Sequence, residues 1–422
     1  MRINFDVNSR WTLFSETTYY ATDYITVQDA DGTAADGGSG FRTIEDTSIT
    51  QEVRASYRGE TINGVAGVYF TDTDTDLNFV ASFPGAFSGF PQSLITGTNG
   101  QRFDATNFAV FGEVELNLFN NWTFIVGGRY DQEQQTDISF ASFTANPPLP
   151  FPLPSSPPTK TEADFSAFLP KGSVIYHWTD EISTGFTVQR GYRSGGAGLD
   201  FVGNQNQFDA EYTTNYELAF RSTSLDKRLV ANANVFYTDW TDQQVTILGP
   251  GGPLDFRTVN AGKSQLYGFE LDARWQVNSN LNVNANLGYT RTRFKEFLTR
   301  VGNDVVDFAG NQFPFAPQWT GSVGGEYYFD NGFVIDAIGN YTSSSFEAAT
   351  NLPGDKSDSY FVVNGRVGYE ADSWSAFVFA RNLFDRTYLP RKRSDPGGDP
   401  FDNIGEPRII GVMITATGDL WR

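Results

Sequence analysis

The sequence predicts an all-β protein, a transmembrane antiparallel β-barrel with long extracellular loops and short periplasmic turns. Two observations support this fold class: apolar and polar residues alternate over long runs, and short turns alternate with long loops. Within 209–294, four runs keep the alternation for about ten residues or more, whereas a membrane-spanning strand needs about 9–11 and a soluble strand averages about five to six. A soluble β-propeller or sandwich is the alternative fold.

The first of these runs illustrates the pattern. Tyr216, Leu218 and Phe220 lie on one face of the expected strand, while Asn215 and Glu217 lie on the other. The apolar face is therefore expected to contact lipid, and the polar face to line a wide, wet lumen.

About 17 candidate strands follow when the alternating runs are read together with the turn residues between them. In chain order they cover 2–7, 11–27, 42–57, 64–78, 104–118, 122–140, 162–177, 182–192, 209–224, 227–247, 255–277, 281–298, 315–330, 333–346, 359–371, 374–386 and 406–421. Short turns rich in Asn, Asp, Ser, Thr or Gly lie at 8–9, 120–121, 179–180, 278–279, 330–332 and 372–373. The long loops cover 28–41, 79–103, 141–161, 193–208, 299–314, 347–358 and 387–405, with a shorter one at 249–253.

An odd number of strands is unusual, because single-chain bacterial barrels normally have even numbers. An open edge in lipid must be paired, because each unpaired backbone group there costs several kcal/mol. Either the first and last strands close a smaller barrel, or further strands belong before Met1. The chain begins within an alternating run and shows no signal peptide, which favours the second alternative.

Eight tryptophans indicate two membrane interfaces, where amphipathic aromatic rings gather. Those near short turns or the C-terminus are Trp11, Trp122, Trp178, Trp275, Trp374 and Trp421, and those at the opposite ends of their strands are Trp240 and Trp319.

Composition excludes several functional classes. The 422 residues contain no Cys and one His, and their formal charge is −20, which argues against a nucleic-acid partner. No apolar run is long enough for a transmembrane helix. His177 stands alone and no Ser lies in a Gly-x-Ser-x-Gly motif, so we expect neither an enzyme nor a cofactor.

Two groups of residues are candidates for binding a ligand. Phe79, Phe83, Phe87 and Phe90 crowd one Gly-rich loop; the alternative is a loop folded onto its own aromatic rings. Arg190, Tyr192 and Arg193 lie where a strand gives way to a Gly-rich loop, and Arg side chains bind carboxylates and phosphates. The alternative for these arginines is ion pairing with acids of the lumen.

Asp72, Asp74 and Asp76 lie on one face of a strand near its outer end. The Gly-centred turn and the later bidentate Glu of a calcium loop are both missing, so we expect a solvated face and no metal site.

Seven segments resemble, in order, motifs of TonB-dependent outer-membrane receptors. They are FAVFGEVEL at 108–116, WTFIVGGRY at 122–130, QRGYRSGG at 189–196, YTTNYELAF at 212–220, NAGKSQLYGFE at 260–270, ARNLFDRTY at 380–388 and GEPRIIG at 405–411. The resemblance implies a barrel of about 22 strands filled by an N-terminal plug domain. Residues 1–422 would then form a partial barrel that lacks about five strands, the plug, the TonB box and the signal peptide.

The resemblance also implies a location and partners. We expect a multi-pass barrel in the outer membrane of a Gram-negative bacterium, in contact with lipid and lipopolysaccharide and assembled by the barrel-assembly machinery. Family members generally end on an aromatic residue, whereas this chain ends on Arg422, and Trp421 would serve instead. The TonB complex would act only through the missing plug.

The implied function is active uptake of a bulky, scarce nutrient, a small-molecule metal chelate such as an iron siderophore, with cobalamin or a glycan as alternative substrates. The rival hypotheses are a non-energised porin-like or adhesive barrel and a truncated receptor without function. The sequence leaves the substrate and the loop residues that contact it undetermined.

Overall fold

Seventeen strands form one antiparallel sheet in the structure, a computed structural model that describes residues 1–29, 39–84, 92–153, 155–199, 205–248, 256–301, 304–394 and 400–416. The sheet comprises β1 (Arg2–Asp6), β2 (Trp11–Asp29), β3 (Ser39–Arg58), β4 (Ile62–Pro84), β5 (Leu94–Leu118), β6 (Trp122–Asn146), β7 (Ser155–Thr179), β8 (Ile182–Arg193), β11 (Glu211–Ser224), β12 (Leu229–Leu248), β13 (Phe256–Gln276), β14 (Leu281–Glu296), β17 (Trp319–Tyr328), β18 (Phe333–Thr342), β19 (Tyr360–Glu370), β20 (Trp374–Arg381) and β23 (Ile409–Ala416). Each strand pairs with the next of these along the chain. The predicted fold class and number of strands are confirmed.

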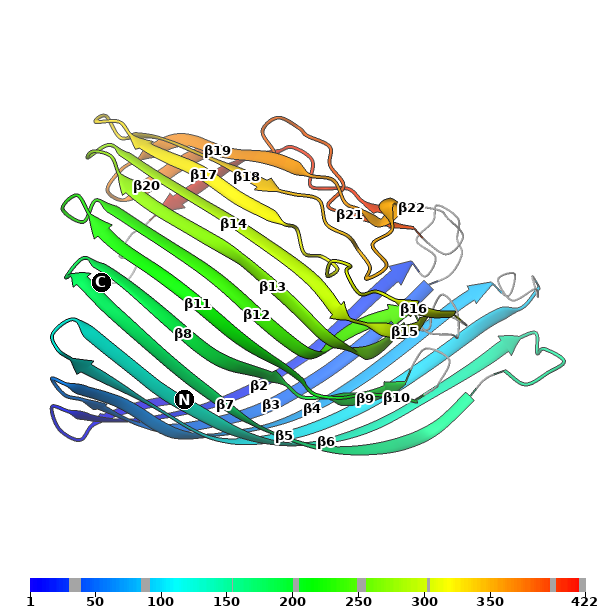
Figure 1. Ribbon diagram of the computed structural model, residues 1–422. Coiled ribbons are helices and arrows are strands. Elements are labelled where there is room, and N and C mark those ends of the chain that lie inside the picture. The colour runs from blue at the N-terminus through cyan, green and yellow to red at the C-terminus, as the bar shows by residue number, and fades with distance from the viewer. Residues whose placement is uncertain are drawn as a thin grey trace, which may run out of the picture.

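The sheet curls into an incomplete barrel (Figure 1). Within the described residues, β1 pairs only with β2, and β23 pairs only with β20. These residues therefore do not form the smaller closed barrel that was one alternative.

The strands differ greatly in length. β4 has 23 residues and β5, β6 and β7 have 25 each, whereas β20 has eight. Since about 9–11 residues cross a bilayer, the long strands extend well beyond it, and Figure 1 shows them reaching past the others at the end with the long loops.

The predicted loop limits at 28–41, 79–103 and 141–161 are therefore wrong at their ends, where β2 to β7 continue. β4 runs to Pro84 and β5 begins at Leu94. On one face of these extensions Ala81, Ile95 and Ala141 are buried by protein, so the exposed apolar face that marks a membrane strand is missing from this part of the sequence.

Three two-stranded hairpins lie at the same end, opposite the short turns (Figure 1). They are β9 (Gly196–Leu199) with β10 (Gln205–Phe208), β15 (Leu298–Val301) with β16 (Asp304–Asp307), and β21 (Arg391–Ser394) with β22 (Pro400–Asn403), and a 3₁₀ helix, η2 (Pro353–Asp355), lies in the loop before β19. All four elements fall in segments that the sequence predicts as long loops, except that Leu298, the first residue of β15, is predicted as the end of a strand.

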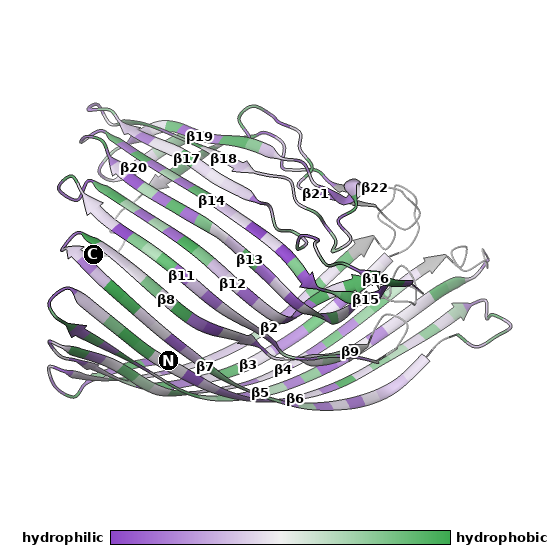
Figure 2. Cartoon of the chain, in the orientation of Figure 1, coloured by the Kyte–Doolittle hydropathy of each residue, from purple (hydrophilic) through white to green (hydrophobic). Residues whose placement is uncertain are grey.

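The two faces of the sheet differ in polarity, and green and purple residues alternate along the strands of Figure 2. On the polar, concave face, Lys171 on β7 reaches across β6 to Glu113 on β5, and Lys171 Nζ lies 2.8 Å from Glu113 Oε2. Apolar side chains on the outer face are about half exposed in the isolated chain, among them Phe108, Val110, Val126 and Phe168. Since full burial of such a side chain gains roughly 1.5–3 kcal/mol, transfer of the exposed half from water to lipid gains on the order of 1 kcal/mol.

Aromatic residues pair near the short turns. The ring centroids of Trp11 and Tyr57 are 5.0 Å apart, and those of Trp122 and Tyr176 are 4.8 Å apart. Trp178, Trp275 and Trp374 are likewise exposed at this end. A second group, Phe269, Tyr289 and Trp319, lies toward the other end of the strands. Membrane contact by these rings stays a prediction.

Trp240 and Trp421 differ from this pattern. Trp240 packs edge-on against Phe313 in a buried cluster, at 5.9 Å between centroids, so it does not join either group. Trp421 lies outside the described residues.

A buried hydrophobic cluster lies in the loop region rather than in the middle of the barrel. It is formed by Val245, Ile247, Ala261, Phe294, Phe297, Phe308, Phe313 and Ala349, and the ring of Phe294 is fully buried. Loop 308–316 is fixed over the ends of β12, β13 and β14 by this packing. Asn311 strengthens the arrangement by donating from Nδ2 to the carbonyl of Ala349 at 2.8 Å.

Asn382, in the segment ARNLFDRTY, holds the last strand of the sheet in place. Only 2% exposed and at φ 45°, it donates from Nδ2 to the carbonyls of Arg386 and Glu406, both at 2.9 Å. Its Oδ1 accepts from the Arg386 amide at 2.9 Å. The residue thereby ties the turn after β20 to the segment before β23.

We expect Asn382→Ala to lower the free energy of unfolding by about 3–5 kcal/mol, because it leaves buried amide and carbonyl groups unpaired and places a residue with a Cβ but no polar side chain in the left-handed region. Urea unfolding in lipid vesicles measures this change. Asn331→Ala is the control, because Asn331 is exposed at a short turn and accepts a single hydrogen bond, from the Phe333 amide at 3.3 Å. Equal losses in both variants would contradict the anchoring role of Asn382.

Candidate functional site

Arg190, Tyr192 and Arg193 lie at the end of β8, where the strand leaves its neighbour β7. β7 and β8 pair only from Lys171 to Thr179, and beyond that point β8 pairs with β11 alone. Strand alternation places Arg190 and Tyr192 on one face and Arg193 on the other. The structure therefore does not bring the three side chains together into one site.

The partners of these residues explain their positions. The Arg190 guanidinium lies 4.4 Å from the centroid of the Tyr212 ring, and Arg193 Nε lies 2.8 Å from Glu211 Oε1. Arg193 thus makes the ion pair that was the alternative to ligand binding. The hydroxyl of Tyr192 is buried and has no hydrogen-bond partner within the described chain.

Glu211 is the centre of a network that fixes the β9–β10 hairpin. Its carboxylate is 7% exposed and accepts a second hydrogen bond, from the Gln244 amide to Oε2 at 2.6 Å. Gln244 Nε2 in turn donates to the carbonyl of Ser194 at 2.7 Å, and Gln135 Nε2 on β6 donates to Ser194 Oγ at 3.1 Å. The start of the hairpin is therefore held from both β6 and β12.

Asn260, in the segment NAGKSQLYGFE, holds the other end of the hairpin. Its Oδ1 accepts from the Asp209 amide at 2.8 Å, and its Nδ2 donates to the carbonyls of Asp209 and Asp242. Asn206 adds a bond from Nδ2 to the Thr258 carbonyl at 2.6 Å. These bonds give the motif a structural role.

The hairpin crosses the fork between β7 and β8. A Cβ added at Gly195 would lie 2.4 Å from the Phe208 carbonyl oxygen and 2.8 Å from the ring of Phe165 on β7, so only glycine fits here. Gly198 lies close to Gln101 on β5. We call β9–β10 with Ser194 and Gly195 the strap, because it spans the part of the wall where β7 and β8 do not pair.

We expect Glu211→Gln to loosen the strap, because the amide NH₂ would face the Arg193 guanidinium and one charged acceptor would be lost, at about 1.5–3 kcal/mol. Amide hydrogen exchange in 205–208 should accelerate by about tenfold or more. Glu296→Gln removes the same charge from an exposed ion pair with Lys263 and should leave this exchange unchanged. An equal effect of both variants would contradict the role of Glu211.

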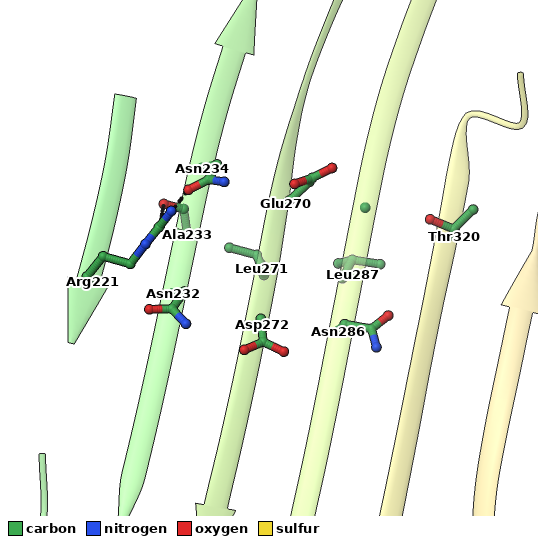
Figure 3. A pocket seen from close by; sticks show the side chains of 11 residues that line it. Arg221, Asn232, Ala233, Asn234, Glu270, Leu271, Asp272, Asn286, Leu287 and Thr320 are labelled. Atoms are coloured by element: carbon green, nitrogen blue, oxygen red, sulfur yellow. Dashed lines mark hydrogen bonds between the residues drawn. The ribbon is translucent and has the colours of Figure 1, made fainter. Parts of the chain in front are cut away.

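A recess of about 330 Å³ lies on the sheet across β11 to β17 (Figure 3). Most of its side chains are amides, hydroxyls or charged groups: Arg221, Asn232, Asn234, Glu270, Asp272, Asn286 and Thr320. Arg221 Nη1 donates to Asn234 Oδ1 at 2.6 Å, and Asn286 Nδ2 donates to Ser322 Oγ at 2.6 Å. The recess offers hydrogen bonds to a polar solute. The sequence did not predict this site, because each strand contributes only one or two of its polar residues.

Two loops near the C-terminus are joined by an ion pair. Lys392 Nζ lies 2.8 Å from Asp358 Oδ1, and the Leu389 amide donates to Asp358 Oδ2 at 3.1 Å. The hydrogen bond from Lys392 is the main reason why the pKa of the Asp358 carboxyl is lowered, with burial opposing it. The rings of Tyr360 and Tyr388 stack beside this pair with centroids 4.2 Å apart.

We expect these loops to separate in acid. The pKa of Asp358 is lowered in the folded protein. Its stabilisation of the folded loops is therefore complete above the ordinary pKa of an aspartate, about 3.9, and is lost as the pH falls through the lowered pKa. The protection of the Leu389 amide against hydrogen exchange, corrected for intrinsic rate, should fall there. The Arg386 amide, which donates to neutral Asn382, is the control; a parallel fall of both would contradict the prediction.

The other sequence candidates are only partly described. The Arg42 guanidinium lies 5.6 Å from the Phe79 ring centroid. Phe83 lies in β4, and its side chain is outside the described part, as are Phe87 and Phe90 altogether. A ligand role for these four residues stays a prediction.

Two of the three aspartates, Asp72 and Asp74, are held by protein partners. Arg102 Nη2 lies 2.6 Å from Asp74, and Thr106 donates to Asp72 at 2.7 Å. Among the described residues, no group of His, Cys, Asp and Glu side chains is placed to hold a metal ion.

A family comparison identifies the fold. The profile of the TonB-dependent receptor-like β-barrel matches residues 1–383. The chain belongs to this family. Members of the family are outer-membrane receptors rather than enzymes, and the described residues contain no helix that is both long and apolar enough to cross a membrane.

Curated relatives of this TonB-dependent receptor barrel are receptors too. The pesticin receptor of Yersinia pestis is 27% identical over 381 residues, which cover 86% of this chain and 50% of the relative. The ferric-pyoverdine M114 receptor PbuA of a Pseudomonas strain is 30% identical over 213 residues, 48% of this chain and 24% of the relative. The chain thus spans about half the length of the pesticin receptor.

Solved structures share the fold. The ferric yersiniabactin uptake receptor FyuA of Yersinia pestis aligns with a TM-score of 0.79 at 20% identity, covering 97% of this chain and 59% of that one. The siderophore receptor PiuA of Acinetobacter baumannii aligns with a TM-score of 0.76 at 14% identity, covering 98% and 63%. At these identities the likeness concerns the fold alone.

Proposed function

We propose that this chain is the barrel wall of an outer-membrane receptor that takes up a bulky, scarce nutrient, an iron siderophore, with energy supplied through TonB. The observation that carries the proposal is the sheet itself, which has an apolar outer face and a polar concave face and belongs to the receptor family. Relatives named as receptors for ferric pyoverdine and ferric yersiniabactin support a metal chelate as ligand.

The described parts have distinct tasks under this proposal. The wall crosses the membrane, in contact with lipid below and lipopolysaccharide around the long strands, after insertion by the barrel-assembly machinery. The recess offers polar contacts to a solute, and the loop region exposes aromatic side chains such as Phe315. Gating and energy coupling would belong to a plug domain that contacts TonB.

We expect cells that produce the full-length protein to accumulate iron from at least one of ferric yersiniabactin, ferric pyoverdine and ferrichrome, in an assay with labelled iron. An uncoupler that collapses the proton gradient should abolish accumulation but leave surface binding, because import and not binding needs energy. Cells without the gene are the control. Accumulation that persists with the uncoupler would instead support a non-energised porin-like barrel.

A further inference from the structure

Phe315 is presented to solvent in a strained backbone conformation. Its φ is 55°, in the left-handed region, and its side chain is 53% exposed. This conformation is unfavourable for a residue with a bulky side chain and persists only where the surroundings fix it. Here the Phe315 amide donates to the Phe346 carbonyl at 2.7 Å, and Phe313 is anchored in the buried cluster.

Arg391 lies over this ring. Its guanidinium carbon is 4.7 Å from the ring centroid, and its Nε is 3.1 Å from Glu347 Oε2. The Glu347 side chain is 5% exposed, whereas that of Arg391 is 55% exposed. A buried carboxylate on one side and an aromatic face on the other therefore fix the plane of an exposed guanidinium.

The backbone that carries Glu347 is ordered by its own contacts. The Glu347 amide donates to the Asp355 carbonyl at 3.0 Å, and Phe346 pairs with Lys356 in an antiparallel bridge. Asn351 binds the neighbouring loop through the Gln312 amide at 2.7 Å. Phe315, Glu347 and Arg391 thus come from three loops that are held together before any ligand arrives.

The unused donors of Arg391 point to a ligand. Its Nε contacts Glu347, whereas its Nη1 and Nη2 groups have no hydrogen-bond partner within the described residues. A guanidinium whose free edge is exposed can bind two oxygen atoms at once, and an exposed aromatic ring beside it can stack on a flat group.

We propose that Phe315 and Arg391 bind a planar aromatic anion, such as the catecholate or aryl carboxylate group of a metal chelate, and that Glu347 positions Arg391. The inference rests on the proposed function and specifies a site for its ligand. Arg391 supplies paired donors to the anionic oxygens, and Phe315 supplies the stacking face.

The test is titration of the full-length protein, purified in detergent, with ferric 2,3-dihydroxybenzoate and with ferric citrate, which is anionic but not aromatic. We expect Arg391→Gln to weaken binding of ferric 2,3-dihydroxybenzoate by about tenfold or more. Phe315→Leu should weaken the binding of ferric 2,3-dihydroxybenzoate at least about threefold more than the binding of ferric citrate, because leucine keeps the apolar bulk but has no π face.

Lys263→Gln is the matched control, because Lys263 also pairs with a carboxylate, Glu296, and its side chain is 60% exposed. An equal loss in Lys263→Gln and Arg391→Gln would show a general effect of charge and overturn the inference. Equal losses for both probes in Phe315→Leu would overturn the stacking role. Arg391→Lys keeps the charge without the paired donors, and wild-type affinity in that variant would contradict two-point recognition.

The outcome separates this inference from the proposed function. A wild-type protein that binds neither probe contradicts the ligand class named here, while energy-dependent iron accumulation in cells would still support uptake. Binding that is unchanged in Arg391→Gln, in cells that import iron, overturns the site alone. Import that fails for every chelate overturns the proposed function even if the purified protein binds ferric 2,3-dihydroxybenzoate at Arg391.

Discussion

The need to pair every backbone amide and carbonyl inside lipid governs the whole molecule. Sixteen junctions between neighbouring strands meet this need, in register over as many as 25 residue pairs between β5 and β6. The outer edges of β1 and β23 have no partner strand within the described residues. Because alternate side chains then point to opposite faces, one face can meet lipid while the other meets water. The polarity of the wall follows from the pairing and needs no buried core in the membrane.

Among the described residues, the buried hydrophobic cluster lies in the loop region, beyond the strands that we expect to cross the membrane. Phe294, Phe297, Phe308 and Phe313 gather in the loop region and are almost wholly buried, as in a small soluble domain. The loops there form a rigid rim, with Asn311 and Asn351 supplying the backbone bonds between them. A receptor mouth built this way presents side chains such as Phe315 in fixed positions without help from a ligand.

The segments that resemble family motifs act as structural anchors in this chain. Asn382 joins the turn after β20 to the segment before β23, and Asn260 holds the strap against β12 and β13. Arg193 is occupied by Glu211, itself fixed by Gln244. Motif residues at the mouth of this barrel therefore preserve shape, whereas the residues offered to a ligand lie in loops without such motifs.

The sequence by itself determined the fold class, the number of strands and the faces of the membrane-spanning runs, because alternation with period two is local and lipid enforces it. Tertiary structure decided the extra length of β4 to β7. In their extended ends one face is covered by protein, with Ala81, Ile95 and Ala141 buried, so the alternation typical of a membrane strand is lost there. It also packed Trp240 against the loop cluster and brought Phe315, Glu347 and Arg391 together. Contacts between loops distant in sequence leave no periodic trace, so only the folded chain shows them.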